Sequence, residues 1–183
     1  MLACRAPDQL TFGPFCRSRA VCSMSGCCRT FAASPPRHDQ RTGHRMTQYT
    51  TVELHGLLAE RYRGQPIQVE LIDGLEPAIN LTLADHGDMQ IQVAASGSQV
   101  FVSTLLAHAE HVNDRAAFND ACLRLNPLNP LSNLGLVQVD GKDRYVVFGE
   151  LSASSTLDQI DEEIQTLAAN TLDAAESLKP FFS

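Results

Sequence analysis

The sequence has no tryptophan, only two lysines and no long hydrophobic run. Its uninterrupted apolar stretches span a few residues, far fewer than the roughly 18 to 20 that a helix needs to cross a bilayer, so no transmembrane helix is predicted. Residues 46–183 contain seven basic and nineteen acidic residues, which leaves a net charge of −12. Because nucleic-acid affinity depends on neutralising phosphates, this part of the chain is not expected to bind nucleic acid.

Cysteine is almost absent after residue 28, and five of the six cysteines come before that point. Residues 1–45 also carry seven arginines, no lysine and two acidic residues, without any helical or strand periodicity. The cysteine spacing is irregular and lacks the pairs of a zinc site. We interpret residues 1–45 as a disordered leader. Its composition also suits an organellar transit peptide, and the simpler alternative is that translation starts at Met46. The folded part is then one domain over 46–183.

A capped helix is predicted just after Met46. Thr50 and Glu53 have the spacing of a capping box, an apolar stripe of leucines follows, and Gly64 with Pro66 forms a stop signal. Strict alternation of apolar residues then predicts strands over 67–71, 79–83 and 89–93, with a further run over 100–106. Short turns between these segments indicate an antiparallel meander.

The second half switches to helical periodicity. Residues 113–125 read as an amphipathic helix that cannot continue through Pro127 and Pro130. Two strands, 134–139 and 145–151, follow around the hairpin dipeptide Asp140-Gly141. A last helix begins after the cap at 154–156 and runs to about Lys179. The sequence therefore predicts an α+β fold with an antiparallel sheet of five to six strands, in the order α-β-β-β(-β)-α-β-β-α, in which the fourth strand is left open.

Groups with chemical potential are few. His108, Glu110 and His111 form the only local cluster with metal-ligand character, but a third ligand at suitable spacing is missing, which favours a solvated loop. Cys122 lies on the apolar stripe of its helix and is interpreted as a core thiol. The pair Glu162-Glu163 is interpreted as part of a solvated helix face. No glycine-rich phosphate loop is present. The sequence therefore predicts no catalytic, cofactor-binding or metal site.

The C-terminal third resembles a known family. The segments that carry the resemblance are Phe118-Asn-Asp-Ala-Cys-Leu-Arg-Leu-Asn126, Pro130-Leu-Ser132, Val147-Phe-Gly-Glu-Leu-Ser152 and the following helix from Ser154 to Ala168. Together they are similar to the bacterial YjfI-like family, a family of domains of unknown function. The similarity is clear over residues 115–178, and the order of elements extends it back to Met46.

The resemblance implies a fold like the type III secretion chaperones and their YbjN-like relatives. The family has no established activity, so no catalytic residue is carried over. Genes of this family often accompany phage-shock-protein-A-like membrane-stress proteins, which by analogy suggests such a coiled-coil partner. Our first hypothesis is a non-enzymatic, cytoplasmic, chaperone-like adaptor, with a homodimer as one form it could take. The alternative is a small-ligand or metal-binding sensor, or an enzyme, whose site forms only in three dimensions, with His108, Glu110 and His111 as candidates.

Overall fold

The computed structural model describes residues 48–182. The predicted disordered leader and the predicted start at Met46 lie outside the described residues. The helices are α1 (Thr51–Arg61), α2 (Arg115–Leu125) and α3 (Leu157–Leu178), and the strands are β1 (Ile67–Ile72), β2 (Ala78–Leu83), β3 (Met89–Ser96), β4 (Gln99–His108), β5 (Asn133–Val139) and β6 (Lys142–Ser152). Four short 3₁₀ turns connect them, η1 (Ala84–His86), η2 (Ala109–His111), η3 (Asn126–Leu128) and η4 (Lys179–Phe181).

The predicted α+β class and element order are confirmed, and the fourth strand forms. The six strands make one sheet in the order β1-β2-β3-β4-β6-β5, and every neighbouring pair is antiparallel. The hairpin β5–β6 therefore joins the meander through β6, and β5 becomes an edge strand. The register of β4 against β6 shifts between Leu105 and Ala107, which marks a bulge.

Local sequence signals explain where the helices begin. The capping box at Thr50 is present, because its side chain accepts from the backbone N–H of Glu53 and the Glu53 carboxylate accepts from the backbone N–H of Thr50. Thr156 and Gln159 form a second capping box at the start of α3, while the Asp114 side chain caps α2. At the β5–β6 turn, Asp140 and Gly141 both have positive φ, as the predicted tight hairpin requires.

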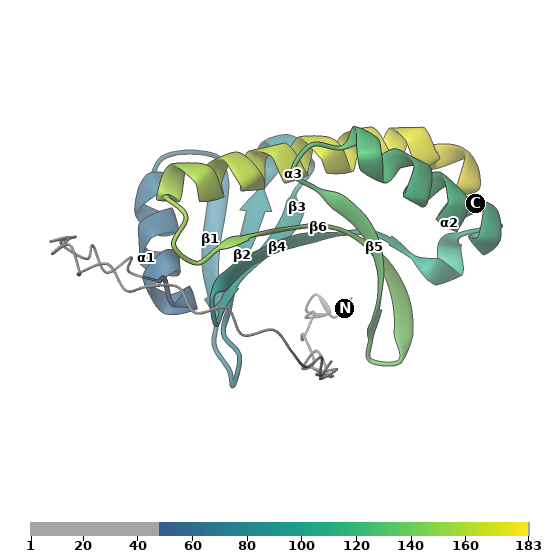
Figure 1. Cartoon of the computed structure of the whole chain (residues 1–183). Helices are drawn as coiled ribbons and strands as arrows, with labels where there is room; N and C mark the ends of the chain where they lie inside the picture. Colours follow the sequence, from purple (N-terminus) through teal and green to yellow (C-terminus); the bar gives the residue numbers. More distant parts are fainter. Residues whose placement is uncertain (1–47, 183) are drawn as a thin grey trace, which may run out of the picture. The chain divides into compact units, whose positions relative to one another are not determined.

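Residues 48–182 form two layers, with the helices on one face of the sheet (Figure 1). The core lies between them. Leu54 and Leu58 of α1 and Ile160, Ile164 and Leu167 of α3 are fully buried against core-face strand residues, which are Ile79, Leu81, Leu83, Ile91, Val93, Val100, Val102, Tyr145 and Val147. The alternation of these strand residues is the pattern that predicted the strands. It also sends every second strand residue to the other face.

The second face of the sheet is not covered by any helix of residues 48–182 (Figure 1). The strands arch beneath α3, so this face is the hollow side of the sheet (Figure 1). We call it the open face. Its central residues are Asn80 of β2, Gln92 of β3, Ser103 of β4 and Phe148 of β6, which follow one another across the strands in register.

Candidate functional site

The predicted histidine cluster lies at one corner of the sheet. His108 is the last residue of β4, and Glu110 and His111 belong to the short turn η2 that follows it. The rings of His108 and His111 are in edge contact, with centroids 5.5 Å apart. Glu110 and His111 are exposed. Within residues 48–182, no group of three or more His, Cys, Asp or Glu side chains is placed to hold a metal ion.

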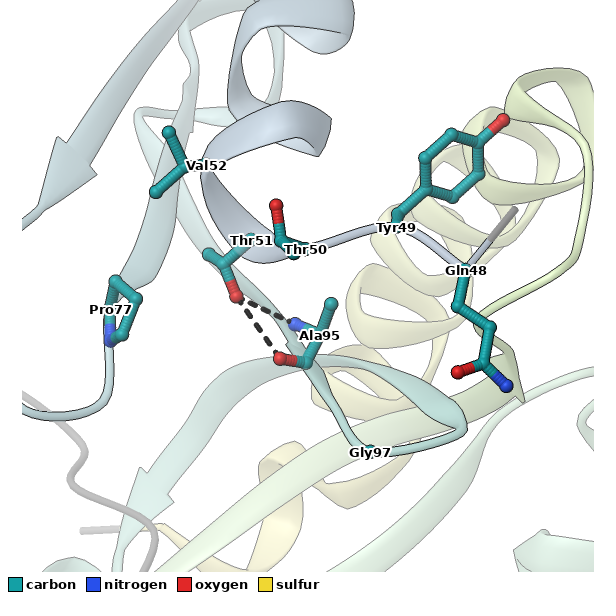
Figure 2. A pocket seen from close by; sticks show the side chains of 8 residues that line it. All are labelled: Gln48, Tyr49, Thr50, Thr51, Val52, Pro77, Ala95 and Gly97. Atoms are coloured by element: carbon teal, nitrogen blue, oxygen red, sulfur yellow. Dashed lines mark hydrogen bonds between the residues drawn. The ribbon is translucent and has the colours of Figure 1, made fainter.

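A surface hollow of about 320 Å³ lies at the start of α1 (Figure 2). Thr51 closes its floor, because the Thr51 hydroxyl donates to the carbonyl of Ala95 at 3.2 Å and accepts from the N–H of Ala95 at 3.0 Å. Val52 and Pro77 line one side, and Gln48 and Tyr49 the other (Figure 2). Among the described residues, the lining contains no carboxylate, imidazole, thiol or basic side chain. Its polar side chains are hydroxyls and one amide, which offer hydrogen bonds.

A second hollow, of about 250 Å³, lies where α3 passes the β2–β3 turn, and Asp161, Asp85 and His86 are among its lining residues. Asp161 is already engaged. It accepts from the Tyr62 hydroxyl at 2.6 Å and from Arg61 Nε at 2.9 Å, which joins α1 to α3. Burial raises the pKa of the Tyr62 hydroxyl well above its ordinary value, and the hydrogen bond from this hydroxyl to Asp161 raises it further. Asp161 therefore serves as a structural acceptor between the two helices rather than as a free base.

Three buried polar atoms on the open face have no hydrogen-bond partner. They are Asn80 Oδ1, Gln92 Oε1 and Ser103 Oγ. Asn80 pairs with Gln92 across β2 and β3, and Gln92 pairs with Ser103 across β3 and β4, so the three residues form one continuous polar row. A buried polar atom without a partner costs roughly 1–3 kcal/mol. Each such atom calls for an explanation, and a bound water, an ion or a partner molecule can supply the missing hydrogen bond.

The polar row continues into an apolar region at the β6 end of the open face. Phe148 pairs with Ser103, and two residues along, Val146 pairs with Leu105. The Phe148 ring lies over Gly135 of β5, where an added Cβ would be 2.9 Å from the ring atom Cε1. Leu105 remains 37% exposed although it lies mid-sheet. The open face therefore combines an aromatic and aliphatic region with unsatisfied hydrogen-bonding atoms.

Glu163 corrects the interpretation of the Glu162-Glu163 pair as a solvated face. Only Glu162 is exposed, whereas Glu163 is 3% exposed and packs against β6. Glu163 lies three residues after Ile160 and four before Leu167, so it falls on the buried stripe of α3. Burial, and secondarily the charge of Glu162, raises its pKa from an ordinary 4.5 to about 7. Its Oε1 atom has no hydrogen-bond partner.

Cys122 is where the helical periodicity placed it. The thiol faces the core from α2 and is 7% exposed. Burial raises its pKa to about 11, so the thiol is protonated and weakly nucleophilic at neutral pH. The core-thiol interpretation is confirmed.

The chain belongs to a bacterial family. The profile of the family described as "Uncharacterized protein conserved in bacteria (DUF2170)" matches residues 48–182, which is the whole of the described fold. The protein is similar to YjfI of Escherichia coli strain K12, at 33% identity over 119 residues that cover 65% of this chain and 90% of the relative. YjfI of Escherichia coli O157:H7 matches to the same extent.

A solved structure shares the fold. It is an uncharacterized protein from Methanothermobacter thermautotrophicus, which aligns with a TM-score of 0.53 at 10% identity and covers 71% of this chain and 99% of that one. The likeness shows the arrangement of helices and strands only. The predicted YjfI-like membership is confirmed, while the likeness to secretion chaperones stays a prediction.

Sequence reasoning missed the two most informative features. The polar row consists of ordinary strand residues, and only the register of three strands brings Asn80, Gln92 and Ser103 together. The burial of Glu163 could have been found, because the position fits the apolar stripe of α3.

Proposed function

We propose that the protein is a non-enzymatic, chaperone-like adaptor of the cytoplasm that holds a segment of a partner protein on its open face. The observation that carries this proposal is the row of buried polar atoms, Asn80 Oδ1, Gln92 Oε1 and Ser103 Oγ, that lack hydrogen-bond partners on a sheet face without a helix. Two of these atoms are carbonyl acceptors. A partner that donates N–H groups to them would recover the free energy that the unpaired atoms lose.

The apolar end of the same face supplies the second half of a protein-binding surface. Protein interfaces combine a central aromatic or aliphatic anchor with surrounding polar contacts. Phe148 and Leu105 provide the anchor, and the polar row provides the contacts. Small-molecule sites instead need a deep concave pocket. The hollows at α1 and at the β2–β3 turn lie elsewhere on the protein.

Charge selects the class of partner. Residues 46–183 carry a net charge of −12, and complementary charge speeds encounter and disfavours acidic partners. A basic, amphipathic helical segment fits both the charge and the half-apolar surface. The family resemblance suggests a phage-shock-protein-A-like coiled coil as that partner. No helix among residues 48–182 is long and apolar enough to span a membrane.

The test compares two exposed leucines on opposite sides of the protein. Leu105→Glu places a carboxylate on the open face, and Leu172→Glu places one on α3, where Leu172 is 46% exposed. The full chain should co-purify with a phage-shock-protein-A-like protein of the source bacterium when both are co-expressed. We expect Leu105→Glu to lower this capture at least about tenfold, since one unfavourable buried charge exceeds 1.4 kcal/mol. Leu172→Glu should capture as the wild type does.

If the partner is still captured by Leu105→Glu but not by Leu172→Glu, the binding surface lies on the helical face instead of the open face. Capture by neither the wild type nor the variants would remove the proposed partner class. Circular dichroism and thermal unfolding of both variants establish that each is folded. A thermal shift with metal ions or metabolites would instead support the alternative of a small-ligand sensor.

We also propose that the homodimer, if it forms, pairs the edge strand β5 of two copies. Asn126 caps part of this edge, because its side chain accepts from the N–H of Leu134 at 2.6 Å and donates to the carbonyl of Leu134 at 3.3 Å. Alternation then directs the backbone groups of Leu136 and Gln138 to the same outer side. The strand contains no charged residue, so two acidic copies could approach here. Light scattering should show a dimer that Leu136→Lys converts to a monomer.

A further inference from the structure

The buried carboxyl of Glu163 faces a strained chain segment. We name residues 129–132, which connect η3 to β5, the 129–132 segment. A Cβ added to Gly149 would lie 1.7 Å from Glu163 Oε1 and 2.9 Å from the carbonyl oxygen of Leu131. Both oxygens therefore lie against the same side of Gly149. Leu131 also has a φ of 62°, a left-handed conformation that is costly for a leucine.

Few hydrogen bonds hold the segment in place. Asn170 Nδ2 of α3 donates to the carbonyl of Pro130 at 2.8 Å and to Ser132 Oγ at 3.1 Å. Asn129 Nδ2 is buried without a hydrogen-bond partner. The Asn170 side chain and one backbone bond, from the N–H of Asn129 to the carbonyl of Asn126 at 3.3 Å, therefore hold the segment over the buried acid, and the backbone strain at Leu131 opposes this closure. Segments with few hydrogen bonds belong to the low-stability end of a structure, where local opening costs less free energy than global unfolding.

The surroundings of Glu163 give its charge no compensation. From β6, Gly149 lies against Glu163, and its cross-strand partner on β4 is the apolar residue Val102. From the 129–132 segment the nearest group is the carbonyl of Leu131, another acceptor. On its own helix, Glu162 adds a like charge. An ionised Glu163 would therefore be a desolvated carboxylate beside a partly negative oxygen, with no donor aimed at its Oε1.

We propose that Glu163 and the 129–132 segment form a pH-responsive latch, closed while the Glu163 carboxyl is protonated and opened when it ionises. In the closed state the neutral acid packs under the Leu131 carbonyl. Loss of the proton to solvent makes the two oxygens repel, and hydration of the carboxylate requires the segment to move off β6. The segment leads directly into β5, so opening also frees the first residues of that edge strand. The raised pKa of Glu163, about 7, sets this change near neutral pH.

The pH dependence follows from linkage. In the open state Glu163 is hydrated and has its ordinary pKa of 4.5, whereas in the closed state the pKa is about 7. The opening equilibrium constant should therefore rise about tenfold per pH unit between those two values and level off above the higher one. Substitution of Glu163 by glutamine, which has the same shape and cannot ionise, should remove this rise.

Hydrogen exchange in the full chain tests the latch. The reporters are the backbone amide of Leu134, which is bonded to Asn126 Oδ1, and the side-chain amide of Asn170. Their protection factors should fall about tenfold per pH unit from pH ~5 to ~7 and then stay constant. They should also be lower than that of the Ile91 amide in the core at every pH, because the latch opens without global unfolding. Glu163→Gln should give protection that does not change with pH.

Glu162→Gln is the matched control. It removes the neighbouring charge that raises the pKa of Glu163. The protection factor of Leu134 should therefore still fall with rising pH, but it should stop falling at a lower pH than in the wild type. A ¹³C titration of the Glu163 carboxyl in the wild type should give a pKa equal to the pH at which the wild-type protection of Leu134 stops falling. Equal protection of Leu134 and Ile91 would overturn the latch, because the buried acid would then act only on global stability. A pH dependence retained in Glu163→Gln would overturn it as well. If Glu163→Gln does not fold, the ¹³C titration and the wild-type protection factors decide between these outcomes.

Discussion

The two faces of the sheet are made from alternate residues of the same strands and obey different rules. On the core face, Ile91, Val102 and Val147 are fully buried in apolar contacts with the helices. One residue away on the open face, Gln92 and Ser103 hold polar atoms without partners. Alternate residues of one strand therefore have different roles. Those on the core face stabilise the fold, and those on the open face gain free energy only when a partner covers them. Substitutions on the two faces should therefore have different and predictable effects.

Replacing one glycine on β6 and one on β5 by alanine should give the largest difference in stability between the two faces. Gly149→Ala on the core face would place a Cβ against Glu163 Oε1 and the backbone carbonyl of Leu131. Because the added Cβ would displace both the buried carboxyl and the 129–132 segment, we expect a loss of about 3 kcal/mol in unfolding free energy. Gly135→Ala on the open face meets only the edge of the Phe148 ring, which can rotate. We expect a change below about 1 kcal/mol, measured by urea unfolding. Equal losses for both variants would erase the distinction between the faces.

Stability should fall with rising pH because of Glu163 on the core face. The folded pKa of about 7 lies above the ordinary value of 4.5. The folded protein therefore holds this proton more tightly, so the contribution is fully present below pH 4.5 and is lost as the pH rises through 7. Because the side chain is 3% exposed, the loss should be on the order of 3 kcal/mol, and Glu163→Gln should abolish it. Urea unfolding across this pH range measures the slope, and a wild type as flat as the variant would contradict the assignment.

Removing either of two neighbouring hydroxyls on β4 should change the stability of the protein in opposite directions. Ser103 Oγ faces the open side and has no hydrogen-bond partner, so Ser103→Ala should raise stability by about 1 kcal/mol. Thr104 Oγ1 faces the core and donates to the carbonyl of Gln90 at 2.7 Å. Its replacement by valine should lower stability by about 1 kcal/mol, since the buried carbonyl loses a donor. Differential scanning calorimetry reports both, and a destabilised Ser103→Ala would mean that the hydroxyl has a partner in solution.

The smallest effect should come from removing residues 1–45. We propose that residues 46–183 fold as one domain, in keeping with the compact unit formed by Thr47–Ser183. A chain that starts at Met46 should unfold within about 1 kcal/mol of the full chain, as is typical of changes away from the core. Thermal unfolding of the two chains makes the comparison. A truncated chain that fails to unfold cooperatively would show that the leader belongs to the fold.

Much of the fold was predictable because it rests on local signals. The capping residue Thr50, the alternation around Leu81 and the dipeptide Asp140-Gly141 each act within a few neighbours in sequence. The fourth strand was ambiguous, since the sequence 99–108 mixes apolar and hydroxyl residues and contains a bulge after Leu105. Its pairing with β6, whose partner residues lie 36 to 53 positions later, stabilises it together with its pairing with β3.

The candidate sites were harder to predict because they depend on long-range packing. Asn80, Gln92 and Ser103 become a row only through the register of β2, β3 and β4. Glu163 looked like part of a charge pair, and its burial depends on Gly149 leaving room on β6. His108 and His111 attracted notice through their sequence proximity, yet within the described residues they are not joined by a third ligand.

The side-chain amide of Asn126 has a consequence for aggregation. By bonding both backbone groups of Leu134, it occupies the place that a residue of a seventh strand would take. An uncharged edge strand such as β5 would otherwise be a template for open-ended growth of the sheet between molecules. A single asparagine thus shortens the exposed template to the end of β5 nearest the hairpin turn.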